Sequence, residues 1–80
     1  MFSRLEGQKV IGLKQTLKHM KNGDGQLLYV AKDADIKLVN PLIELANEQS
    51  LKIVFIDTMK ELGKVCGIDV GASVVLVLDK

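Results

Sequence analysis

Apolar and polar positions along the chain form blocks that predict strands and helices in turn. Four strands are predicted, at Lys9–Gly12, Gln26–Ala31, Lys52–Ile56 and Ser73–Leu78. The second contains the continuous apolar run Leu27–Val30, which is typical of a strand covered on both faces. After the first strand, Leu13, Leu17 and Met20 stand at i, i+4 and i+7 and predict a helix with one apolar face.

Helix-breaking and helix-starting residues set the bounds of the two central helices. The first is predicted over Leu13–Asn22, where an Asn-Gly-Asp-Gly sequence stops it. In the second, Ile36–Val39 forms one helical turn, and the helix then restarts with Asn40 as N-cap and Pro41 at the first helical position. This helix is predicted to end near Ser50.

Two further helices are predicted from the spacing of the capping box, in which a serine or threonine precedes a glutamate by three residues. One runs from Thr58 through Cys66 and is closed by a glycine. The other is a short helix at Ser3–Gln8, with Ser3 as N-cap and Glu6 three residues later.

The alternation of strands and helices predicts an α/β fold, a three-layer α/β/α sandwich around a mixed sheet of roughly four strands. The 80 residues fit one domain, residues 1–80, and the apolar content of 48% is typical of a folded globular chain. A chain of this length hides only about 60% of its unfolded surface. It has little room for an enclosed substrate cavity, which favours a binding module over an enzyme.

Charge and cysteine content narrow the classes of partner and compartment. The net charge is only +1, so affinity for nucleic acid has to come from a local arrangement of charges. Cys66 is the only cysteine, which excludes an intrachain disulfide and agrees with reducing conditions. No apolar run reaches the ~18–20 residues of a membrane span, and Glu6 is an acid too early for a signal peptide. We therefore expect a cytoplasmic protein.

A basic stripe lies beside the apolar face of the helix Leu13–Asn22. Lys14, Lys18 and Lys21 repeat the spacing of the apolar residues one position on, and Gln15 adds an amide. Unpaired backbone N–H groups at a helix start attract anions, so this side of the helix suits phosphates and base edges. An ordinary solvated helix face is the other interpretation of the same residues.

Asp33 and Asp35 follow an apolar strand, where magnesium-dependent phosphoryl-transfer enzymes often place paired carboxylates. The alternative, which we favour, is that Asp35 caps the next turn and Asp33 stabilises the loop through bonds to the backbone. His19 and Cys66 have no catalytic partners at recognisable spacing, and a lone histidine makes no zinc site. We assign no catalytic residue and no metal ligand.

Two features near the C-terminal end remain. Gly63 lies inside a predicted helix, where glycine costs about 1 kcal/mol relative to alanine, and this indicates close packing. Ile68, Asp69 and Val70 form a loop with two β-branched apolar residues, which either fold down onto the core or stand out as a contact surface. The residues alone leave both alternatives open.

The chain carries three motifs in a fixed order, at Gly12–Lys18, Leu28–Asp35 and Glu61–Gly71. Together they resemble the ribosomal protein L7Ae family, over nearly the whole chain, and most of all its small stand-alone bacterial members. The resemblance implies an α/β/α sandwich that binds kink-turn RNA, an internal loop with tandem sheared G·A pairs and a sharp backbone bend. It implies neither a cofactor nor catalysis.

The resemblance also implies site residues. The family pattern Gly-x-Asn-Glu-x-x-Lys matches at Gly12, for a close backbone approach, and at Lys18, for a phosphate or guanine contact. Lys14 replaces the family's asparagine and Gln15 its glutamate, which predicts stronger salt dependence and weaker base selection. The loop Ile68-Asp69-Val70 matches the apolar loop that packs against a flipped-out nucleotide, which favours the contact-surface alternative for this loop.

Three positions near the second motif complete the comparison. Lys32 and Lys37 are candidates for contacts with the RNA backbone, with solvated surface as the equal alternative, and Ile36 replaces a proline common in the family. The predicted partner is a structured RNA, ribosomal or regulatory, bound by a monomer. The competing interpretations are a protein–protein adaptor that uses the loop Ile68–Val70 and a small phosphoryl-transfer enzyme.

Overall fold

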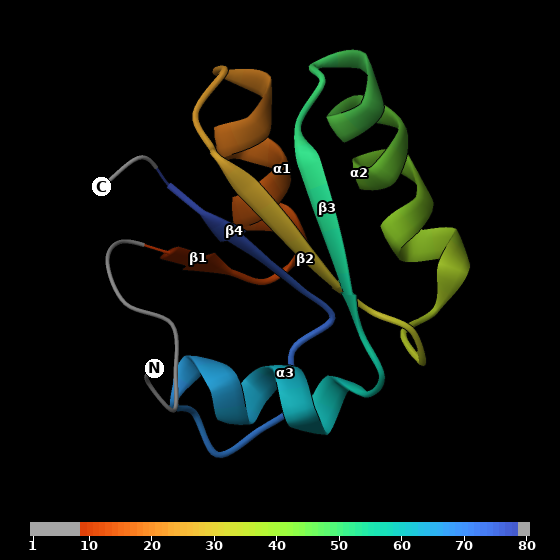
Figure 1. The fold of residues 1–80 in the computed structure, drawn as a ribbon, viewed down its shortest axis with the longest axis vertical. Helices are drawn as coiled ribbons and strands as arrows, with labels where there is room; N and C mark the ends of the chain where they lie inside the picture. Colours follow the sequence, from red (N-terminus) through yellow and green to blue (C-terminus); the bar gives the residue numbers. More distant parts are fainter. Residues whose placement is uncertain (1–8, 79–80) are drawn as a thin grey trace.

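The computed structural model describes residues 9–78 and contains the predicted alternation of elements. In chain order these are β1 (Lys9–Ile11), α1 (Leu13–Lys21), β2 (Leu27–Ala31), α2 (Ile36–Glu48), β3 (Lys52–Ile56), α3 (Met59–Cys66) and β4 (Val74–Val77) (Figure 1). The helix predicted at Ser3–Gln8 lies outside the described residues. Within residues 9–78, no helix is long and apolar enough to cross a membrane.

The four strands form one mixed sheet in the order β1-β4-β2-β3. β4 is antiparallel to both of its neighbours, β1 and β2, whereas β2 and β3 are parallel. As a result β1, β2 and β3 all end at the edge of the sheet where β4 begins. We call this edge, with the turns that leave it, the loop edge.

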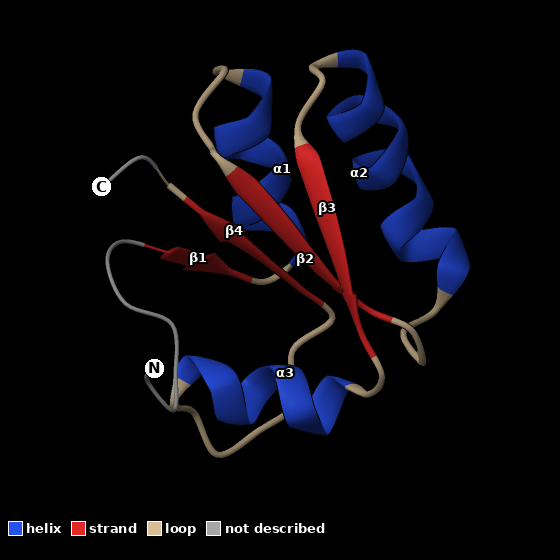
Figure 2. Ribbon diagram, viewed as in Figure 1, coloured by secondary structure: helices blue, strands red, loops and turns tan. Residues whose placement is uncertain are grey.

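Helices cover both faces of the sheet, so the predicted three-layer α/β/α sandwich is confirmed (Figure 2). On one face, α1 and α2 enclose a core that contains Met20, Leu28, Val39, Leu42, Ala46 and Leu76. On the other face, α3 encloses a smaller core built around Leu62, Cys66 and Val75. The alternation along β2 feeds both cores, because Leu28 and Val30 face the first whereas Tyr29 and Ala31 face the second.

α2 corrects one prediction from the sequence. It is a single helix from Ile36 to Glu48, and Pro41 lies inside it rather than at a restart after an Asn40 N-cap. Asp35 is the N-cap, since its Oδ1 accepts a hydrogen bond from the N–H of Lys37 at 3.0 Å. The helix continues through the proline because the residues that bury its apolar face lie on both sides of it, at Val39, Leu42 and Ala46.

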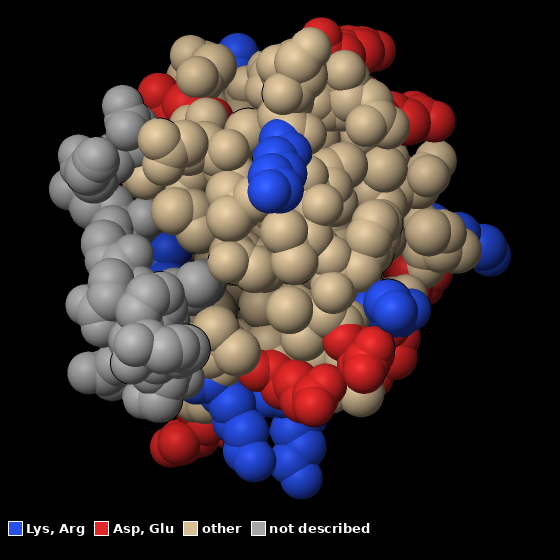
Figure 3. Space-filling model, viewed as in Figure 1, with Lys and Arg blue, Asp and Glu red and all other residues tan. Residues whose placement is uncertain are grey.

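The α3-covered face of the sheet is covered only near the loop edge. Farther along the strands, Leu27, Val54 and Val77 are half-buried and belong to neither core, and the exposed Lys52 shares this face. Seen from this side, the surface is largely free of charge apart from an isolated basic group near its middle (Figure 3). Charged side chains lie instead around the rim of this view, with acidic groups along the top and groups of both signs along the lower rim near α3 (Figure 3).

Candidate nucleic-acid interface

The loop edge brings together three segments that are far apart in the sequence. They are the turn at Gly12 that leads into α1, the β2–α2 loop at residues 32–35, and the α3–β4 loop at residues 67–73. Backbone hydrogen bonds tie the first two to the third: Gly12 N–H donates to the Val74 carbonyl at 3.2 Å, and Ala31 N–H donates to the Ser73 carbonyl at 2.9 Å. Nearly all of the candidate site residues belong to these segments or to the helices that start beside them.

The candidate residues of α1 lie on its exposed face because the opposite face of the helix packs on the sheet. Met20 is fully buried in the core, and the equally buried Thr16 hydroxyl donates to the Val10 carbonyl at 3.5 Å. Lys14, Gln15 and Lys18 are consequently exposed. The sequence did not predict that Thr16 belongs to the buried face of α1. A single threonine in this helix gives no signal that its hydroxyl is buried and hydrogen-bonded to β1.

Within residues 9–78, no side chain caps the backbone N–H groups at the N-terminus of α1. Gly12 is the N-cap with φ of 108°, a left-handed conformation that favours glycine, and it offers no side chain to the first turn. No acidic residue stands in that turn. Lys14 and Lys18 add like charges at i, i+4, a pairing that costs a helix about 0.2–0.5 kcal/mol. The missing side-chain cap, the absence of an acid and the charge of Lys14 favour an external anion at this end of α1, whereas Lys18 lies in the last turn of the helix.

The candidate lysines differ in whether a carboxylate already neutralises them. Lys14 lies in the first turn of α1, at the loop edge, and Lys18 in its last turn. Within residues 9–78, Lys14, Lys18 and Lys37 form no ion pair, and all three are exposed. Lys32 instead lies with its Nζ 3.4 Å from Oδ1 of Asp57, both side chains being largely exposed. The structure therefore leaves three of these cations available to a ligand, whereas Lys32 is shared with a carboxylate.

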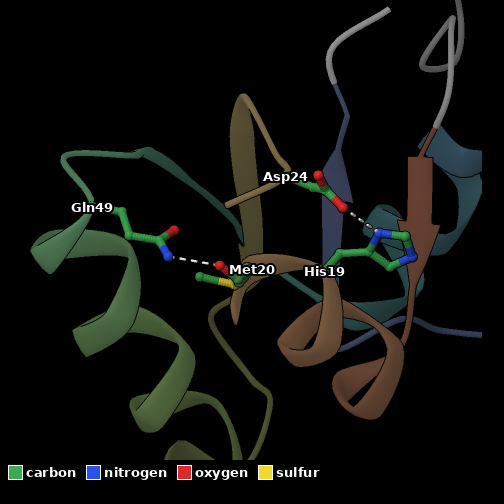
Figure 4. A network of polar contacts seen from close by, with 4 residues as sticks. All are labelled: His19, Met20, Asp24 and Gln49. Atoms are coloured by element: carbon green, nitrogen blue, oxygen red, sulfur yellow. Dashed lines mark hydrogen bonds and ion pairs between the residues drawn. The ribbon is translucent and has the colours of Figure 1, made fainter. Parts of the chain in front are cut away.

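The C-terminal end of α1 is held by two contacts that the sequence did not suggest (Figure 4). The side-chain N–H of Gln49, just beyond α2, donates to the Met20 carbonyl at 2.6 Å, and this fixes α1 against α2. His19 Nδ1 lies 3.1 Å from Oδ2 of Asp24, and the His19 side chain is half-buried. These contacts lie at the opposite end of the helix from Gly12, so they hold α1 in place without occupying its N-terminus.

Asp33 and Asp35 have the structural roles that we favoured over magnesium chemistry. Asp35 caps α2, and Oδ1 of Asp33 accepts a hydrogen bond from the N–H of Met59 at 2.7 Å. Met59 is the first residue of α3, so Asp33 ties the β2–α2 loop to the start of a helix 26 residues later. Among the described residues, no group of three His, Cys, Asp or Glu side chains is arranged to hold a metal ion.

The α3–β4 loop divides its two β-branched residues. Ile68 packs into the α3-side core, and its N–H donates to the Gly63 carbonyl at 3.0 Å, next to the left-handed Gly67 that ends α3. Val70 points outward and is 70% exposed, and Asp69 is exposed beside it. Ile68 thus folds onto the core, as in the first alternative for this loop, whereas Val70 stands out from it, as in the second.

Cys66 is a buried core residue rather than a nucleophile. It is 6% exposed within the α3-side core. Burial raises the pKa of its thiol, and the nearby Lys9 only partly opposes this effect. A thiol with a raised pKa carries little thiolate at neutral pH, so it is poorly suited to covalent catalysis.

Comparison with known proteins places the chain among well-defined relatives. The model of the ribosomal protein L7Ae/L30e/S12e/Gadd45 family matches residues 3–80. An RNA-binding protein of Caldanaerobacter subterraneus subsp. tengcongensis is 52% identical over 66 residues, which cover 82% of this chain and 80% of the relative. The RNA-binding protein YbxF of Geobacillus stearothermophilus is 42% identical over 72 residues, 90% of this chain and 88% of the relative.

A solved structure has the same fold. The Giardia lamblia 15.5kD RNA binding protein superimposes with a TM-score of 0.84 at 27% sequence identity, covering 90% of this chain and 61% of its own. The names of these relatives are those of RNA-binding proteins, in agreement with the expectation that the chain is not an enzyme.

Proposed function

The chain belongs to the ribosomal protein L7Ae/L30e/S12e/Gadd45 family, and from this premise we propose that it binds RNA that contains a kink-turn. The observation that carries the proposal is the loop edge, where the exposed Lys14 and Gln15 lie with the exposed Val70, while Lys18 continues the exposed face of α1 one turn farther along the helix. Cationic and amide groups together with an apolar projection suit an RNA element that offers phosphates, base edges and a splayed base.

The proposed contacts of α1 divide between backbone and base recognition. Gly12 lets the RNA approach the protein backbone closely because it has no side chain, and Lys18 binds a phosphate or a guanine. Gln15 contacts the edge of a G·A pair, where its amide both donates and accepts, whereas a glutamate would only accept. Lys14 contributes a point charge in place of a bidentate amide. We infer a binder that depends more on phosphate attraction and less on base identity.

The two loops complete the proposed interface. Val70 packs against a nucleotide extruded at the bend, with Asp69 beside it and Ile68 supporting the loop from the core side. Lys37, which is exposed and free of ion pairs among residues 9–78, contacts the RNA backbone. Lys32 does so after exchanging its contact with Asp57 for a phosphate.

Recognition of this kind is selection of a shape. The surface is preformed by the sheet and its hydrogen-bonded loops, so it fits the bent RNA and shifts the RNA population toward that state. The protein acts as a monomer in the cytoplasm, needs no cofactor, and its targets are ribosomal RNA or a structured regulatory RNA. The family's name and the names of the relatives support this class of partner.

A titration with two RNAs tests the proposal. One carries a generic kink-turn, and the other has its tandem G·A pairs replaced by Watson–Crick pairs, with the salt concentration held fixed because affinity depends on it. We expect tight binding to the kink-turn RNA alone. Equal affinity for both RNAs, or affinity for neither, contradicts kink-turn recognition.

A protein–protein adaptor is the second candidate, and the observation that favours it is the 70% exposure of Val70. Replacing Lys14 and Lys18 together by glutamate separates the two functions. The double substitution abolishes binding to an RNA because it reverses two charges, whereas an apolar contact at Val70 tolerates it.

A further inference from the structure

Gly63 of α3 lies directly against the backbone of the α3–β4 loop. A methyl group at this position would overlap the carbonyl oxygen of Val70, and would lie 3.1 Å from the Val70 carbonyl carbon and 3.2 Å from Cα of Gly71. All three atoms belong to the backbone, so none of them can move aside by a side-chain rotation. The loop rests on α3 in its present position only because residue 63 has no side chain.

Hydrogen bonds hold both ends of the same loop on α3. Ile68 N–H donates to the Gly63 carbonyl at 3.0 Å, and Ala72 N–H donates to the Met59 carbonyl at 3.0 Å. Gly71 also lies close to α3, since a methyl group there would meet Cβ of Met59 at 3.1 Å. The loop is thus fixed at its two ends and packed against the helix in its middle, and the Val70 side chain is 70% exposed on it.

We propose that Gly63 is a positioning residue for RNA binding, which acts by setting the height and direction of the Val70 side chain above the loop edge. This inference rests on the proposed function. A larger residue at position 63 pushes the Val70 carbonyl away from α3, and because both loop ends stay bonded, the displacement falls on the middle of the loop. Val70 then no longer meets the extruded nucleotide.

The lysines of α1 lie apart from the contact between Gly63 and the Val70 loop. Gly63 touches neither α1 nor its lysines, and Lys18 lies on a helix that packs on the opposite face of the sheet. A defect at Gly63 should therefore act through Val70 and leave the contribution of Lys18 intact. This difference separates positioning from a general loss of stability, which would weaken every contact alike.

A double-mutant cycle with the kink-turn RNA tests the proposal. We expect Val70→Ala to weaken binding about tenfold, or about 1.4 kcal/mol, and Gly63→Ala to weaken it to a similar extent. The double variant should bind no more weakly than Gly63→Ala alone. Combined with Lys18→Ala, by contrast, Gly63→Ala should give the product of the two separate losses.

Two further variants guard against a simple folding defect. Gly71→Ala adds a milder clash beneath the same loop and should lose about threefold in affinity, again without further loss when Val70→Ala is added. Leu28→Ala removes a fully buried side chain from the α1 and α2 side of the core, so it lowers stability without touching the loop. It should bind RNA like the wild type below its melting temperature.

The binding measurements distinguish failure of the proposed function from failure of the inference about Gly63. Wild-type affinity that does not distinguish the kink-turn from its Watson–Crick control overturns the proposed function and this inference with it. Selective wild-type binding overturns the inference alone if Gly63→Ala and Gly71→Ala bind like the wild type. It is also overturned if their losses multiply with that of Val70→Ala.

Discussion

Removal of the Lys18 charge should change how RNA binding depends on salt. The size of the change can be calculated from the number of exposed lysines in the candidate site. Lys14, Lys18 and Lys37 are exposed and free of ion pairs among residues 9–78. If each neutralises one phosphate, each contributes about 0.7–0.9 to the slope of log affinity against log salt concentration. Three such lysines give a slope of about −2 to −3, and Lys32 is not counted because Asp57 already offsets its charge.

Between 50 and 200 mM salt, that slope weakens wild-type binding about 20- to 40-fold. Lys18→Ala removes one contribution, so the same change of salt weakens the variant only about tenfold. The substitution should therefore cost about three times more affinity at 50 mM than at 200 mM salt.

The assay is a fluorescence titration of labelled kink-turn RNA at four salt concentrations, with Lys52→Ala as the matched control. Lys52 is also exposed, but it begins β3 at the end of the sheet opposite the loop edge. The Lys52→Ala substitution therefore removes one positive charge, as Lys18→Ala does, but no phosphate contact. We expect its slope to equal that of the wild type. An unchanged slope for Lys18→Ala, or an equal reduction for both variants, refutes the assignment of Lys18 as a phosphate contact.

Three further predictions concern the framework that holds the interface. Asp33→Ala removes the acceptor of the Met59 N–H and should lower the melting temperature followed by circular dichroism by about 4–8 °C, whereas added magnesium should leave it unchanged. Gln49→Ala breaks the 2.6 Å bond to the Met20 carbonyl and should cost about 1 kcal/mol of unfolding free energy in urea, with RNA affinity retained. Because burial raises the pKa of Cys66, the folded state prefers the neutral thiol, so stability should fall as the pH rises above the ordinary thiol value of 9.0; Cys66→Ala should lack that part of the fall.

Local sequence signals predicted the elements well where one residue decides the structure. The capping box at Thr58 and Glu61 begins α3, with Oγ1 of Thr58 accepting the Glu61 N–H at 3.0 Å, and Gly67 ends the same helix in the left-handed region. Pro41 misled the prediction because its local preference for a helix start competes with burial of Val39 and Leu42, whose side chains hold one helix across it. Tertiary packing decides such a competition, and it is not visible in a local pattern.

The candidate site also combines features that the sequence predicted with contacts that it did not. The exposure of Lys14 and Lys18 follows from helical spacing, which a sequence shows directly. The bond from Asp33 to Met59 joins residues 26 positions apart, and the contact of Gly63 with Val70 depends on how the loop folds back on α3. A glycine inside a helix indicated close packing at Gly63, but no pattern along the chain identifies Val70 or Met59 as the partner, because both contacts arise only when the fold brings the segments together.

The order of the strands has a consequence for protein synthesis. Among the strands within residues 9–78, β4 is the last to be translated, yet it lies between β1 and β2, and its Val74 carbonyl accepts the Gly12 N–H. A nascent chain that has exposed α1 but not β4 therefore carries the lysines without the surface that orients them. RNA recognition should begin only once residue 77 has emerged, so a partly made chain cannot compete with finished protein for the same RNA.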